Sequence, residues 1–137
     1  MKRVAMMLGL SGVLLFGLGV GTGLAAKTYA DSKNRVEKDR TDLSGAPGME
    51  VIASLAEYKP GDSLDLHSHP GIEASYVVQG ASLGFAGEAP IKLTTGSTLL
   101  ALRDIKHGDF KIVGDTSLKL YTVHIVDKGK PLYEFGN

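Results

Sequence analysis

The chain has 137 residues, of which 43% are hydrophobic, enough for one domain and too few for two. Basic and acidic side chains number 15 each, and the resulting net charge of zero argues against the basic face that nucleic-acid binding requires. The absence of cysteine excludes a disulfide scaffold, a thiolate zinc site, an iron–sulfur cluster and a cysteine nucleophile.

Residues 1–30 have the layout of an export signal. Lys2 and Arg3 precede a charge-free run over residues 4–26, and small side chains then suit cleavage after Ala30. An alternative is that the segment stays uncleaved, because about 20 apolar residues suffice to span a bilayer. Both interpretations export the rest of the chain: it is periplasmic or secreted after cleavage, or held at the inner membrane through residues 4–26.

The exported part divides into a linker, a strand-rich region and a tail. Residues 31–48 mix both signs of charge and end in a turn cluster, so we interpret them as a linker, and residues 128–137 as a C-terminal tail. Between them, short apolar or alternating runs are separated by Gly, Pro, Asp and Ser. The predicted strands are 49–58, 63–69, 73–79, 82–87, 91–95, 97–102, 109–113 and 118–126.

This strand spacing predicts an all-β domain, a sandwich or small barrel over residues 49–127. A domain of this size buries a modest fraction of its surface, and its sheets have edges to cover. We therefore expect a homodimer.

The stretch from Gly61 to Gly80 carries the chemistry. His67 and His69 are two residues apart on a predicted strand, so their side chains leave one face about 7 Å apart. After a Pro-Gly turn, Glu73 begins the next strand and can return opposite the two histidines. Two imidazoles and a carboxylate make three ligands for a divalent cation. A fourth ligand must come from elsewhere, and the remaining histidines are His107 and His124.

These residues resemble the first signature of the cupin superfamily, G-x5-H-x-H-x3-E-x6-G, which the stretch fits at every fixed position. The second cupin signature fits less well. Gly96 and His107 stand at the right spacing, but Leu102, Asp104 and Lys111 replace its Pro, Gly and Asn. The resemblance is to small, exported, single-domain bacterial cupins. It implies a jelly-roll barrel, or double-stranded β-helix, and a metal site formed by His67, His69, Glu73 and His107.

Three further residues are candidates for the surroundings of this site. His124 alternates with Thr122 on the last strand and is expected beside the ligands as a supporting residue or as plain structure. Tyr76 is a candidate for the cavity wall, with ordinary core packing as its alternative. Asp109 lies two residues beyond His107, so an extended backbone would turn both to the same side, with solvent as the alternative.

Three imidazoles and one carboxylate suit Fe, Mn, Ni, Zn or Cu as the divalent ion. Four protein ligands leave room for water, dioxygen or a substrate oxygen on an ion that accepts five or six. The resemblance favours a metal-dependent oxidoreductase of dioxygenase type acting on a small organic molecule. The alternative is a non-catalytic module that binds a small molecule or only the metal. The metal-free sugar epimerase branch is disfavoured because the ligand set is intact. No nucleic-acid partner is expected.

Overall fold

The structure is a computed structural model that describes residues 29–136. Residues 1–28 of the predicted leader lie outside the described residues, whereas Tyr29 and Ala30, just before the predicted cleavage point, form a short strand. Cleavage and anchoring both stay predictions. Within the described range every regular element is a strand, so no helix there is long and apolar enough to cross a membrane. The all-β prediction is confirmed. The strands are β1 (Tyr29–Ala30), β2 (Arg35–Asp42), β3 (Met49–Tyr58), β4 (Ser63–Leu64), β5 (His67–Ser68), β6 (Gly71–Gln79), β7 (Ala81–Gly84), β8 (Ile91–Leu93), β9 (Thr98–Ala101), β10 (Phe110–Val113), β11 (Leu118–Asp127) and β12 (Tyr133–Phe135).

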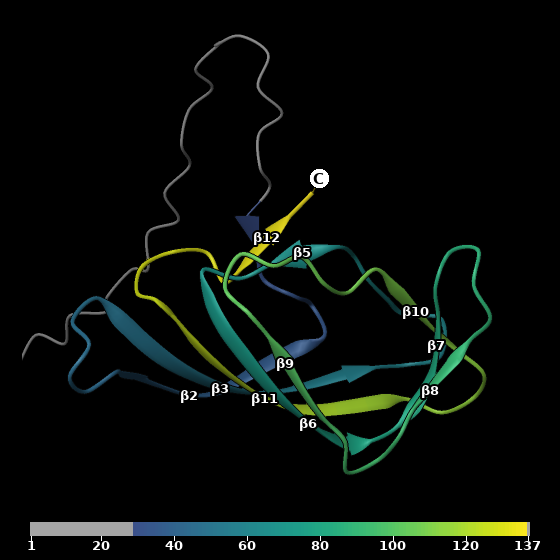
Figure 1. Ribbon diagram of the computed structural model, residues 1–137. Helices are drawn as coiled ribbons and strands as arrows, with labels where there is room; N and C mark the ends of the chain where they lie inside the picture. The colour runs from purple at the N-terminus through teal and green to yellow at the C-terminus, as the bar shows by residue number, and fades with distance from the viewer. Residues whose placement is uncertain (1–28, 137) are drawn as a thin grey trace, which may run out of the picture.

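Three antiparallel sheets surround a common interior (Figure 1). The largest has the order β2-β3-β11-β6-β9, the second β4-β10-β7-β8, and the smallest β1-β12-β5. The predicted strand over residues 63–69 is split, because β4 pairs with β10 whereas β5 pairs with β12. A strand that bends and changes sheets in this way forms a corner of the barrel.

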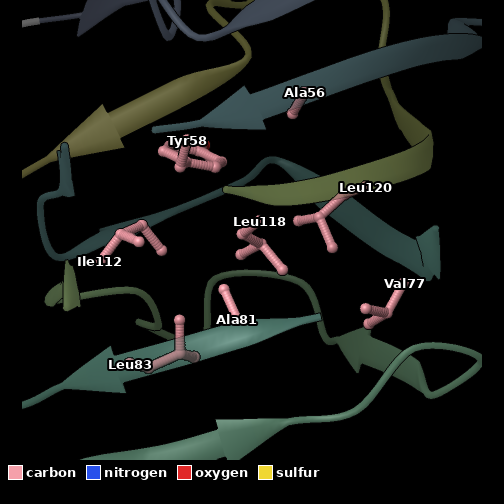
Figure 2. Close-up of a cluster of buried hydrophobic side chains, with 8 residues drawn as sticks. All are labelled: Ala56, Tyr58, Val77, Ala81, Leu83, Ile112, Leu118 and Leu120. Carbon is pink, nitrogen blue, oxygen red and sulfur yellow. The ribbon is translucent and has the colours of Figure 1, made fainter. Parts of the chain in front are cut away.

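The interior is filled by alternate residues of the long strands. On β3 and β11 every second side chain is buried, as the alternation in the sequence predicts. Figure 2 shows the main cluster, in which side chains of the two larger sheets meet. Its members are Ala56, Tyr58, Val77, Ala81, Leu83, Ile112, Leu118 and Leu120. A second cluster of Ile52, Val126, Leu132 and Tyr133 lies beneath the small sheet.

The linker and tail predictions are wrong where the chain pairs. Arg35–Asp42 form β2 along β3, at the edge of the largest sheet. The mixed charges of this segment led to the linker prediction. An edge strand also carries charged side chains, because they prevent pairing with a further strand. In the tail, Tyr133–Phe135 form β12 between β1 and β5, and Leu132 and Tyr133 are buried.

Two glycines of the first signature have identifiable roles. Gly61 has a φ of 90°, in the left-handed region that L side chains rarely adopt. At Gly80 a Cβ would lie 2.1 Å from the carbonyl oxygen of Leu93. Glycine therefore lets the chain turn at one end of the motif and lets two backbone segments touch at the other.

Candidate metal centre

The four predicted ligands converge from three segments of the chain. His67 lies on β5, His69 follows it directly, Glu73 lies on β6, and His107 precedes β10. The backbones of His67 and His107 exchange two hydrogen bonds, of 3.0 and 2.8 Å, across an isolated bridge. This bridge fixes the loop ligand against the strand ligand.

One potential ligand atom from each residue lies within 4.8 Å of the others. Oε2 of Glu73 is 3.0 Å from Nε2 of His69 and 3.3 Å from Nε2 of His107. Ligands at right angles around an ion with bonds of about 2.1 Å are about 3 Å apart. The spacing therefore fits one common ion.

Backbone carbonyls set the orientation of all three imidazoles. Nδ1 of His67 donates to the Asp65 carbonyl at 2.8 Å, that of His69 to Leu132 at 2.6 Å, and that of His107 to Ile105 at 3.0 Å. A neutral ring that donates through Nδ1 has its lone pair at Nε2, which is the form that binds a metal. The three histidines thus share a feature of metal sites: a hydrogen bond holds Nδ1, which leaves Nε2 available to bind an ion.

Glu73 is oriented just as firmly. Its Oε1 accepts a hydrogen bond of 2.7 Å from Ser75, while Oε2 faces the imidazoles. An imidazole lone pair and a carboxylate oxygen are both acceptors, so contacts of 3.0–3.3 Å between them require a proton or a metal ion. The donor set and its orientation therefore fit a divalent cation.

The charges of the cluster follow from burial and from Glu73. Burial raises the pKa of Glu73, but the imidazoles of His107, His124 and His69 outweigh it and hold the pKa well below its usual range. Burial lowers the pKa of His107, yet the hydrogen bond to Glu73 produces a net increase. Burial lowers the pKa of His67 to about 4. The carboxylate therefore stays ionised, and His67 stays neutral at pH 7.

Acid should destabilise the metal-free protein through His67. The pKa of His67 is about 4 in the folded chain, compared with the ordinary imidazole value of 6.5, so the unfolded chain binds the proton more tightly. Stability is thus greatest above pH 6.5 and falls as the pH drops from 6.5 to 4, by about 3 kcal/mol in total. Urea unfolding in a chelating buffer at several pH values measures this slope.

His67→Gln is the matched control for the pH slope. Glu73, whose pKa is lowered, also makes the stability fall as the pH decreases, and this effect remains in the variant. The raised pKa of His107 has the opposite effect, because it favours the folded chain at lower pH. We expect the variant to lose part of the slope between pH 6.5 and 4. An unchanged slope would show that His67 titrates normally in the folded protein.

Comparison with solved structures gives the fold a name. A Klebsiella pneumoniae protein with a double-stranded β-helix domain superposes with a TM-score of 0.55 and 16% identity, over 79% of this chain and 92% of that one. In this fold the four signature residues His67, His69, Glu73 and His107 lie close together, as described above. The chain has a double-stranded β-helix fold, the fold that the resemblance to cupins predicts.

Two other structures are more distant. A cupin superfamily protein from Desulfitobacterium hafniense has a TM-score of 0.40 and 16% identity over 72% of this chain and 83% of that one. The DMSP lyase DddQ from Ruegeria pomeroyi has a TM-score of 0.47 and 17% identity over 58% of this chain, which spans 40% of the lyase. No protein-family profile matches the sequence. No curated protein matches it either.

The altered second signature still forms its turn in this double-stranded β-helix. Asp104, which stands in place of the glycine, has a φ of 60° and so adopts the left-handed conformation itself. Its backbone N–H donates to the His69 carbonyl at 3.1 Å. The substitution therefore leaves His107 in place beside the other ligands.

His124 lies beside the cluster, as expected for a supporting residue. It pairs with Glu73 in the β6–β11 register and is fully buried, and its Nε2 is 3.7 Å from Oε2 of Glu73. Neither of its ring nitrogens has a hydrogen-bond partner among the described residues. A buried imidazole without hydrogen-bond partners is rare. A small movement of Glu73 towards an ion would leave His124 facing the site.

The expectation for Tyr76 is wrong, whereas Asp109 is exposed to solvent, one of the two positions that the sequence left open for it. Tyr76 lies three residues from Glu73 on β6, which places it on the opposite, outer face of the sheet, 49% exposed. Asp109 is exposed because Gly108 and Asp109 both have positive φ, which breaks the alternation that would have returned it to the side of His107. Neither residue contributes to the cavity.

Sequence reasoning missed several residues that support the ligands. Ser75 had a detectable signal, since it lies two residues from Glu73 and so shares its face. The Leu132 carbonyl and the Tyr133 ring, 4.8 Å from the rings of His67 and His69, gave none, because their segment was read as a tail. At Gly108 a Cβ would lie 3.0 Å from Nδ1 of His67, so the missing side chain makes room for that ligand.

A cavity of about 360 Å³ lies inside the cupin barrel and reaches His67, Glu73 and His107. Most of its wall is apolar and comes from the two larger sheets. The ligands thus face both a protein shell that orients them and a space that a small molecule can enter.

Proposed function

We propose that this cupin binds one divalent transition metal through His67, His69, Glu73 and His107 and uses it to act on a small organic molecule inside the barrel. One observation carries the proposal: four oriented donors converge, and three of them lie at the wall of a largely apolar cavity. When bound, the ion supplies Lewis-acid or redox chemistry at that wall. The dioxygenase-type oxidoreductase remains the proposed reaction class.

The residues around the ion have separate tasks in this proposal. The three backbone carbonyls keep each Nε2 directed inward, and Ser75 keeps one oxygen of Glu73 away from the metal. The apolar wall limits the water that reaches the site, which strengthens electrostatic interactions there.

The alternative is a module in which the ion only binds or supports the fold. A structural site is closed by protein ligands, whereas a catalytic one keeps an exchangeable position. Three of the four donors border the cavity, which favours the open arrangement.

Elemental analysis of the purified protein tests the proposal. We expect about one transition metal ion per chain, and almost none in the double variant His67→Ala/His107→Ala. Iron, copper or manganese would support redox chemistry, whereas stoichiometric zinc would favour hydrolysis or a structural ion. Metal content that is equal in both proteins, or absent from both, would overturn the proposed site.

A further inference from the structure

The wall of the cavity excludes some classes of substrate. Its ionisable side chains other than tyrosine are three of the ligands, His67, Glu73 and His107, and among residues 29–136 no lysine or arginine lines it. An anionic group on the apolar part of the wall, away from these ligands, would therefore have no cationic side chain to pair with. Burying an unpaired charge is costly, so the wall disfavours phosphates, sulfonates and additional carboxylates.

The same wall favours flat apolar groups. Phe85 and Phe110 line it, with their ring centroids 6.5 Å apart in an edge-on arrangement, and Tyr58 packs against Phe110. Leucines from β7, β8, β9 and β11 complete the surface. At about 30 Å³ for each water volume, a space of 360 Å³ corresponds to roughly a dozen non-hydrogen atoms.

One polar group on the wall has no partner. Thr122 lines the cavity and is 3% exposed, and its hydroxyl makes no hydrogen bond within residues 29–136. It lies two residues before His124 on the same face of β11, about 7 Å along the strand. A buried hydroxyl that lacks a partner beside an open space suits a polar atom of a bound molecule.

We infer that the cavity takes a largely apolar molecule of about the size of two fused rings, uncharged along the part that lies away from the metal centre. One of its oxygens points to the metal centre, and a polar atom accepts or donates a hydrogen bond at Thr122. The inference rests on the proposed function for the metal-directed oxygen, whereas the absence of charge follows from the wall alone.

A pair of probes that differ by one charge tests this inference. We expect the zinc-loaded protein to bind 6-hydroxynaphthalene-2-carboxamide at least about tenfold more tightly than 6-hydroxynaphthalene-2-carboxylate by isothermal titration calorimetry, because the two have the same size and the carboxylate gains no partner on the apolar wall. Equal or tighter binding of the carboxylate, or binding of neither probe, would overturn the inference. The same titration on the metal-free protein keeps it separate from the proposed function: preference for the carboxamide there supports the wall argument even if no metal is held.

Two variants locate the effect. Leu99→Arg adds a cation to a partly exposed part of the wall and should reduce the preference for the carboxamide about tenfold, whereas Leu99→Gln should leave it unchanged. Thr122→Val should weaken carboxamide binding several-fold at unchanged metal content, because the amide loses its hydrogen-bond partner. Carboxamide binding that is identical in Thr122→Val would remove the threonine from the inference.

A second, independent feature is the outer face of the largest sheet. The outward positions of its three central strands are all apolar away from the strand ends: Val51, Ala53 and Leu55 on β3, Tyr121, Val123 and Ile125 on β11, and Ile72, Ala74, Tyr76 and Val78 on β6. Register aligns Val36, Leu55, Tyr121 and Tyr76 in one row across four strands, each more than 40% exposed. An antiparallel sheet with one face in water normally carries polar residues there.

We propose that a second copy of this chain covers this face. Five strands about 4.8 Å apart and about seven residues long give about 500 Å² a copy, or about 1,000 Å² for two, which reaches the size of a specific interface. A flat sheet packs on an identical sheet about 10 Å away with its apolar side chains interleaved. The outward positions named above carry no charged side chain, so two copies that meet across a two-fold axis would not repel each other there.

Sedimentation equilibrium tests the dimer. We expect a dimer for the wild-type protein and a monomer for Tyr121→Lys, while Thr116→Lys, which adds the same charge in an exposed turn, should remain dimeric. Circular dichroism checks that each variant is folded. A wild-type monomer, or a dimer that survives Tyr121→Lys, would overturn the proposal, and flotation of a monomer with phosphatidylcholine vesicles would instead assign the face to a lipid surface.

Discussion

Zinc at about a hundred times its dissociation constant is expected to raise the free energy of unfolding by about 2.7 kcal/mol. The four donors come from residues 67–107 and meet only in the folded chain, so the ion binds the native state far better than the unfolded one. Thermal unfolding with and without zinc measures the effect as a shift of about 10 °C in Tm for a domain of this size.

His107→Ala is the control for this gain. It removes the half-buried ligand that lies outside the strands and leaves β5 and β6 intact. We expect zinc at the same concentration to raise its Tm little, and excess chelator to return the wild-type protein to its metal-free Tm. An equal shift in the variant would mean that zinc stabilises the chain somewhere else.

Gly80→Ala is expected to lower the free energy of unfolding by at least about 3 kcal/mol, the upper end of the range for overpacking. The added Cβ would lie 2.1 Å from the Leu93 carbonyl oxygen and 2.8 Å from the Thr95 nitrogen. Both are backbone atoms, so two strands must separate to relieve the clash. The midpoint of urea unfolding measures the loss.

Gly84→Ala provides the comparison, since the Cβ there first meets a side-chain methyl of Val113 at 3.0 Å. A side chain can rotate where a backbone cannot, so the cost should stay within about 1 kcal/mol. Similar losses in the two variants would contradict the assignment of Gly80 to a backbone contact.

The sequence was most informative where one rule governs the structure. Alternating apolar residues placed β3 at residues 49–58, where it is found, because one face of that strand is buried along its whole length. The motif spacing identified four ligands that the fold brings together. In both cases local pattern and tertiary contact agree.

The failures arose where the tertiary structure overrides the local pattern. Arg35–Asp42 is a strand because β3 offers it an edge, and nothing in its own composition records that partner. Two successive positive φ angles, which the sequence does not reveal, decide between the two positions open to Asp109. Tyr76 lies three residues from Glu73, and an odd separation on a strand puts two residues on opposite faces, so Tyr76 faces outward.

The carbonyl that orients His69 belongs to Leu132, 63 residues further along the chain, and β12 then pairs with β5 at His67. A chain cut before Leu132 would therefore contain every ligand and still lack the group that fixes one of them. In the proposed site, full metal binding would therefore depend on the last strand as well as on the four donors, so metal content would report whether β12 is in place.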